Sequence, residues 1–155
     1  MFANLSLAAL LTLLVIMLHL TGLLVLLHFL RRNAHHANGG DGVRYSLRQG
    51  AIVLTVVFGV FLLHAAEISL YGLTYVAVGA FKEFETALYF SASAFSTLGF
   101  GDVVLGPDWR MLSAVEGVSG LILIGWSSGF LLSVTSRLRL LEHEWESYAE
   151  RNRKV

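Results

Sequence analysis

Residues 84–102 have the sequence FETALYFSASAFSTLGFGD, a short apolar stretch followed by alternating glycines. A helix rises about 1.5 Å per residue, so residues 84–95 would reach only about 18 Å. The hydrocarbon core of a bilayer is about 30 Å thick, and this segment cannot cross it. Such a segment enters a membrane only if it returns on the same side, with its non-helical backbone shielded by protein or facing water. The stretch therefore predicts a re-entrant loop.

The composition of the whole chain indicates a membrane protein. Hydrophobic residues make up 55% of its 155 positions and charged residues only 14%, which is too apolar for a soluble domain of this size. Three stretches reach or exceed the roughly 20 residues that a helix needs to span hydrocarbon. They run from about Leu5 to Leu30, from about Gly50 to Val78 and from about Met111 to Ser136. We predict an all-α integral membrane protein with three transmembrane helices and one re-entrant helix.

The basic residues indicate an orientation. The formal net charge is zero, yet nine of the eleven Lys and Arg residues lie in two groups. Cytoplasmic segments are enriched in Lys and Arg, so both groups should be cytoplasmic, with the N-terminus outside and the C-terminus inside. The chain has no cysteine, which excludes disulfides and thiol chemistry. The two groups are Arg31, Arg32, Arg44 and Arg48, and Arg137, Arg139, Arg151, Arg153 and Lys154.

The segment of residues 97–102, called the 97–102 segment below, has the composition of a site for a dehydrated cation. Such an ion needs several oxygen ligands, and a pore on a symmetry axis supplies them as stacked rings of backbone carbonyls. Aiming successive carbonyls at one axis requires alternating ordinary and left-handed backbone, which glycine adopts without steric penalty. Gly99 and Gly101 stand at alternate positions, and Thr97 adds a hydroxyl at the inner mouth. The pattern predicts a cation site built from backbone oxygens.

The remaining residues of the 97–102 segment are expected to support it. Leu98 and Phe100 should turn their side chains away from the axis and wedge the loop from behind, with Asp102 at the outer mouth. Tyr89, on the preceding helix, is placed to bond Asp102 across the back of the loop. Acidic side chains favour a helix start, and Glu83 and Glu85 mark the beginning of that helix.

The order Thr-Leu-Gly-Phe-Gly-Asp resembles the signature of potassium channels, in which Thr, an aliphatic residue, Gly, an aromatic residue, Gly and Asp follow a short pore helix. The resemblance covers residues 50–136 and implies a homotetramer with K⁺ as the permeant ion. It implies that the ion-binding residues are Thr97, Leu98, Gly99, Phe100 and Gly101, with K⁺ at the first four. It implies an outer helix at 50–78, a pore helix at 84–95, a selectivity filter at 97–102 and an inner helix at 110–136. The rest would be an extra N-terminal transmembrane helix at 1–31, a cytoplasmic linker at 32–49 and a cytoplasmic amphipathic tail at 137–155.

The resemblance extends more closely to small bacterial members of that family. They carry a His-x-x-Glu pair in the first pore-domain helix, as at His64 and Glu67, and a Glu followed by Gly-Trp-Ser in the inner helix, as at Glu116 and residues 125–127. Two departures concern the filter. Phe100 replaces the commoner Tyr and removes a supporting hydroxyl, and Ser93 stands where some members place a Glu that bonds to the filter Asp.

Two groups of ionisable residues fall within the predicted spans, where a charge is costly and indicates function. We expect Glu116 to stabilise the pore helix and filter through pore-helix hydroxyls such as those of Ser91 or Ser93; the alternative is a protonated Glu with one interhelical hydrogen bond. His64 and Glu67 lie three residues apart on one helix face and should pair. The functional alternative is a proton sensor, because imidazole titrates near neutral pH.

The other histidines and the small residues of the third span carry weaker signals. His19 and His28 fall on opposite helix faces, so they cannot chelate one metal; each should be capped by a neighbour or reach an interface. His35 and His36 should be solvated. Small residues such as Gly120 and Gly125 more often allow close helix packing than mark a hinge; the alternative is a hinge at Gly120 or Gly125 at which the inner helix bends during gating. The register from Trp109 places five residues near the pore axis, with Phe130 as a possible constriction: Ile122, Gly125, Gly129, Phe130 and Ser133.

These expectations combine into one functional prediction. The chain should be a subunit of a homotetrameric, potassium-selective channel in the cell membrane, conducting K⁺ passively among membrane lipids. It should not be an enzyme, and neither a cofactor nor a nucleic-acid partner is expected. The alternatives are a weakly selective cation channel and a non-conducting or transport-associated membrane subunit. The tail carries apolar residues at heptad spacing, which fits a helix on the membrane surface or a short bundle.

Overall fold

The computed structural model describes residues 2–34 and 42–137, and within them all regular structure is α-helical. Four helices follow one another along the chain. They are α1 (Phe2–Ala34), α2 (Gly42–Ala77), α3 (Phe84–Phe95) and α4 (Arg110–Arg137). The prediction of an all-α protein is confirmed. The tail at 138–155 and the pair His35 and His36 lie outside the described residues.

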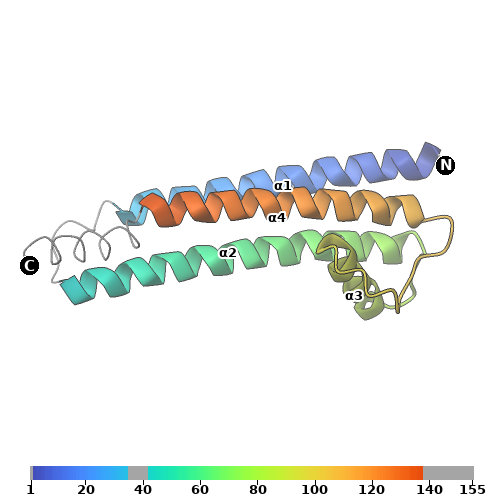
Figure 1. Ribbon diagram of the computed structural model, residues 1–155. Coiled ribbons are helices and arrows are strands. Elements are labelled where there is room, and N and C mark those ends of the chain that lie inside the picture. The colour runs from blue at the N-terminus through green and yellow to red at the C-terminus, as the bar shows by residue number, and fades with distance from the viewer. Residues whose placement is uncertain (1, 35–41, 138–155) are drawn as a thin grey trace, which may run out of the picture.

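Three of these helices are long and apolar enough to cross a membrane. The candidate spans are Asn4–Arg32, Leu47–Ala77 and Arg110–Ser136, which confirms the three predicted transmembrane helices. Figure 1 shows the three long helices side by side, with the short α3 at one end of the bundle. Exposed side chains along the spans are largely apolar, for example Leu13, Val25 and Phe61. Such side chains suit contact with lipid.

α2 begins earlier than the sequence predicts. The expected start was Gly50 and the expected linker extended to residue 49, whereas the helix begins at Gly42. Hydropathy marks the part of a helix that lies in hydrocarbon, but a helix continues into water as long as its backbone bonds are made. Residues 42–49 include Arg44 and Arg48, so the apolar pattern starts after the helix does.

α1 is packed into the body of the protein. It contacts both α2 and α4, and its residues Ala8, Leu11 and Val15 are buried in one apolar cluster with residues of all three other helices. The shared members of this cluster include Tyr71 of α2, Phe95 of α3 and Leu112 of α4. The extra N-terminal span is therefore part of the core.

α3 enters from the end of the bundle and turns back. It packs against α2 and α4, and the chain returns through residues 96–109 to the start of α4 (Figure 1). The side-chain amide of Asn4 donates a hydrogen bond to the carbonyl oxygen of Asp108 in this return segment. The beginning of α1 and the returning loop therefore lie at the same end of the protein.

Candidate functional site

The backbone of the 97–102 segment alternates in handedness. Thr97 has a φ of 60°, Gly99 of 58° and Gly101 of 79°, while Leu98 and Phe100 between them have no positive φ. Thr97 is the one non-glycine residue with positive φ in the described part of the chain. A left-handed conformation costs a residue with a side chain about 1–3 kcal/mol and persists where the surroundings impose it, commonly at functional sites. The strain at Thr97 therefore makes this segment the candidate functional site.

Ser93 supports the segment from α3. The Gly99 amide donates to the backbone carbonyl of Ser93 at 3.2 Å, and the Phe100 amide donates to the Ser93 hydroxyl at 3.3 Å. The Thr97 amide donates to the carbonyl of Ala94 at 3.0 Å. Ser93 is buried. It cannot supply the bond to Asp102 that a glutamate would make, yet it fixes two consecutive amides of the segment.

Tyr89 and Asp102 are brought together at the C-terminal end of the segment. The Tyr89 hydroxyl donates to Oδ2 of Asp102 at 2.8 Å, and the Tyr89 ring stacks on Phe100 with centroids 6.3 Å apart and an interplanar angle of 10°. The hydrogen bond to the Asp102 carboxylate raises the pKa of Tyr89. The phenol therefore stays protonated at neutral pH and keeps donating.

Glu116 links three helices at a fully buried position. Its two carboxyl oxygens accept hydrogen bonds from Tyr75 of α2, at 2.6 Å, and from Ser91 of α3. The Ser91 hydroxyl also lies 2.9 Å from the carbonyl oxygen of Ile68. Of the two pore-helix hydroxyls expected to bond Glu116, Ser91 makes the bond, whereas Ser93 bonds the 97–102 segment. Sequence reasoning missed Tyr75, which had no motif to single it out.

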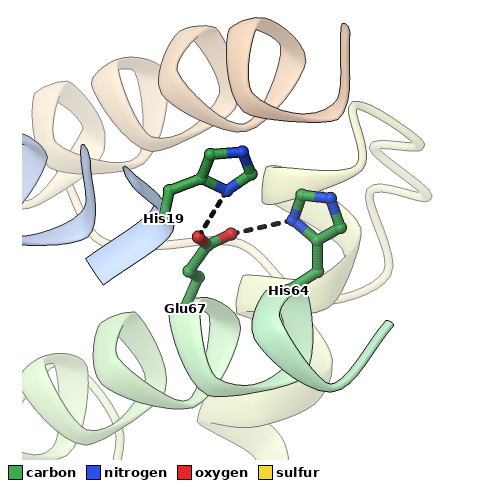
Figure 2. Close-up of side chains that lie close together, drawn as sticks. All are labelled: His19, His64 and Glu67. Carbon is green, nitrogen blue, oxygen red and sulfur yellow. Dashed lines mark hydrogen bonds and ion pairs between the residues drawn. The ribbon is translucent and has the colours of Figure 1, made fainter. Parts of the chain in front are cut away.

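His64 and Glu67 pair as a one-turn spacing predicts, and a third residue joins them. Nδ1 of His64 lies 2.8 Å from Oε2 of Glu67, and Nδ1 of His19 lies 2.8 Å from Oε1. Figure 2 shows the two imidazole rings on either side of the Glu67 carboxylate, with His19 coming from α1. Sequence reasoning missed this role of His19, since nothing in one sequence indicates which face of α1 meets α2. His28 is exposed.

A comparison with known families identifies the fold as that of a pore. A family model described as an ion channel matches residues 50–137, more than half of the chain. The chain belongs to this two-helix, pore-loop ion channel family. Membership points to a channel in a membrane rather than to an enzyme and is consistent with a potassium channel pore domain. No curated protein and no solved structure matches the chain.

Within this channel subunit, α3 and α4 meet at a glycine. A Cβ added to Gly120 would lie 2.1 Å from the carbonyl oxygen of Phe95, the last residue of α3. Gly120 is buried. Its lack of a side chain lets α4 touch the backbone that leads into Thr97, so Gly120 serves close packing. Gly125 has nothing within 4 Å of such a Cβ.

The face of α4 that the sequence places near a pore axis is largely open in the channel subunit. Ile122 is 61% exposed, and Gly125, Gly129 and Ser133 are exposed as well. Phe130 differs, because it is partly buried and packs against the cluster of Leu23, Val60 and Leu63. In the single subunit this side chain packs toward α1 and α2, and a constriction at Phe130 stays a prediction.

Proposed function

We propose that this chain is a subunit of a homotetrameric potassium channel whose selectivity filter is the 97–102 segment. The observation that carries the proposal is the alternation of left-handed residues at Thr97, Gly99 and Gly101. Alternating handedness turns successive carbonyl oxygens toward the same side of a strand. Four such segments around one axis would replace the hydration shell of a cation with rings of carbonyl oxygens.

The preference for K⁺ rests on the similarity of the segment to the potassium-channel signature. The hydroxyl of Thr97 adds an oxygen ligand at the inner mouth, below the rings at Leu98, Gly99 and Phe100. The hydrogen bonds that Ser93 accepts and the pair of Tyr89 and Asp102 hold the loop from behind. These contacts take the place of the missing tyrosine hydroxyl and the missing glutamate.

Exposed apolar side chains support assembly with further copies of the chain. Leu98 is 63% exposed and Phe100 is 64% exposed in the single subunit. Burying the apolar side chains of such a loop against another chain is favourable by about 25 cal/mol of free energy per Å² of apolar surface removed from water. Each chain supplies one 97–102 segment, so a closed ring needs several chains. Four is the number that the family resemblance implies.

The orientation we propose follows the basic residues. The N-terminus and the Asp102 end of the segment would lie outside, and the C-terminus in the cytoplasm. The bond between Asn4 and Asp108 supports this arrangement, because it puts the start of α1 beside the loop that follows Asp102. Potassium would then pass down its electrochemical gradient without a chemical step.

Flux measurements on purified protein test the proposal. Liposomes that contain only this chain should show K⁺ flux, with a reversal potential in mixed Na⁺ and K⁺ close to that of K⁺, and crosslinking should trap four chains. Gly99→Ala should abolish the flux, because alanine at a φ of 58° costs about 1–2 kcal/mol in each subunit. Gly106→Ala is the matched control, since Gly106 has an ordinary φ and open space around its Cβ position.

Two other outcomes would replace the proposal. Equal permeation of Na⁺ and K⁺ would indicate a weakly selective cation channel, for which the absent hydroxyl at Phe100 is the specific argument. Absence of flux from correctly assembled tetramers would indicate a non-conducting or transport-associated subunit.

A further inference from the structure

Three ligand-type side chains from two helices converge inside the membrane-spanning part of the protein. His19 of α1 and His64 and Glu67 of α2 each offer one ligand atom, and these atoms all lie within 4.8 Å of one another. The centroids of the two imidazole rings are 5.5 Å apart, and both rings face the same carboxylate (Figure 2). The cluster is separate from the 97–102 segment, and conduction through carbonyl rings does not use it.

The donor set suits one class of metal ion. Two imidazole nitrogens and one carboxylate are ligands of Zn²⁺ and related divalent transition metals, with metal–ligand distances of about 2.0–2.2 Å. An ion at the centre of a triangle with 4.8 Å sides is about 2.8 Å from each corner. Shifts of about 0.7 Å or less would therefore complete the three bonds. Side-chain rotation alone provides shifts of that size.

The cluster is largely buried. The side chains of His19 and Glu67 are fully buried, whereas that of His64 remains 17% exposed. An ionised carboxylate inside a membrane protein is stable only when paired or bound to a metal.

The surroundings of His19 fit a ligand that is held in place. Metal-binding histidines usually bond through their second ring nitrogen to a neighbouring group, which fixes the orientation of the ring. Nε2 of His19 lies 3.4 Å from the hydroxyl of Ser127 on α4, while Nδ1 faces Glu67. Ser127 is buried. The ring of His19 is thus aimed at the cluster by a group from a third helix.

We propose that His19, His64 and Glu67 bind one divalent transition-metal cation of the zinc type, which fastens α1 to the pore domain. The ion would join the N-terminal span to α2 at the level of Phe95, whose ring centroid lies 5.7 Å from that of His64. Binding would stabilise the end of α3, next to the 97–102 segment. The site does not depend on which ion the pore conducts.

Equilibrium dialysis of the purified, full-length protein against Zn²⁺ tests the site. The protein carries no histidine tag, is stripped with a chelator, and has His35→Gln and His36→Gln in every sample, so that these two imidazoles do not contribute. One Zn²⁺ per chain is expected, with Mg²⁺ failing to compete because it prefers oxygen ligands. His19→Gln, His64→Gln and Glu67→Gln should each weaken binding at least about tenfold. His28→Gln should leave it unchanged.

A second measurement uses the protein without changes to the cluster, in case a variant fails to fold. The indole of Trp126 lies 5.6 Å from the His19 ring, so Co²⁺ bound in the cluster should quench its fluorescence in a saturable way that Zn²⁺ reverses. Trp126→Phe should remove most of the quenched signal. Absence of saturable Zn²⁺ binding to the unaltered cluster would overturn the proposal. Equal Zn²⁺ affinity in all three ligand variants would overturn it as well.

Discussion

Replacing Gly120 with alanine tests whether the contact between α3 and α4 positions the 97–102 segment. The new methyl carbon would lie 2.1 Å from the carbonyl oxygen of Phe95 and 2.8 Å from its carbonyl carbon. Real Cβ atoms stay beyond 3.0 Å, so the two helices must separate by about 0.9 Å. Both contacts are with backbone, which cannot rotate away as a flexible side chain would. The displaced carbonyl is two residues before Thr97.

The energetic effect can be isolated with a second glycine. Overpacking of a closely packed contact costs about 1–3 kcal/mol, whereas alanine in place of glycine within a helix gains up to about 1 kcal/mol. Gly50→Ala provides the helical gain alone, because nothing lies within 4 Å of a Cβ at Gly50. The difference in unfolding free energy between the two variants should therefore be about 1–3 kcal/mol, with Gly120→Ala the less stable.

Thermal unfolding in detergent and K⁺ flux in liposomes measure the two consequences. Gly120→Ala should unfold at a lower temperature than Gly50→Ala and should conduct less, because the shift of Phe95 is passed directly to Thr97. If both variants unfold at the same temperature and conduct equally, the close contact does not position the segment and the reasoning fails.

Three further predictions concern the supports of the segment. Tyr89→Phe removes the bond to Asp102, and sustained currents should decline faster. In the unaltered protein the raised pKa of Tyr89 keeps the phenol protonated and the bond intact at neutral pH, and the bond is lost only when the phenol deprotonates at strongly alkaline pH. Currents that depend on alkaline pH equally with and without the hydroxyl would refute this. Glu116→Leu leaves the buried Tyr75 hydroxyl unpaired, at a cost of about 1–3 kcal/mol, whereas Glu116→Gln keeps an acceptor; equal melting temperatures of the two would argue against a brace. Ser93→Ala removes the acceptor of the Phe100 amide and should lower stability by about 1 kcal/mol, while Ser69→Ala, which loses only a bond within its own helix, serves as the control.

Local features of the chain were predictable because their causes are local. α3, which runs from Phe84 to Phe95, is predictable as a segment too short to cross a membrane, with acidic residues at its start. Alternating glycines predict alternating handedness, and Gly99 and Gly101 have positive φ. The left-handed conformation of Thr97 was not predictable, because a threonine adopts it only when its surroundings impose it.

Features that depend on helix rotation were not accessible from one sequence. Apolar residues surround a membrane helix on all sides, so hydropathy does not distinguish a face in lipid from a face in protein. Tyr75 was therefore not recognised as a partner of Glu116, nor His19 as a partner of Glu67. The start of α2 at Gly42 was missed because the first residues of this helix are largely polar, and the apolar pattern begins only after them.

The N-terminal span gains a physical reason from the same contacts. Glu67 is fully buried, and a pore domain made of α2, α3 and α4 alone would leave one of its carboxylate oxygens without the partner that His19 provides. The apolar side of α1 fills the same cluster that holds Phe95 and Leu112, so the helix that bonds this carboxylate oxygen also covers the apolar surface behind α3. An α1 that carried only apolar residues would cover this surface and leave Oε1 of Glu67 without its partner. His19 is therefore the residue that makes α1 specific to this pore domain.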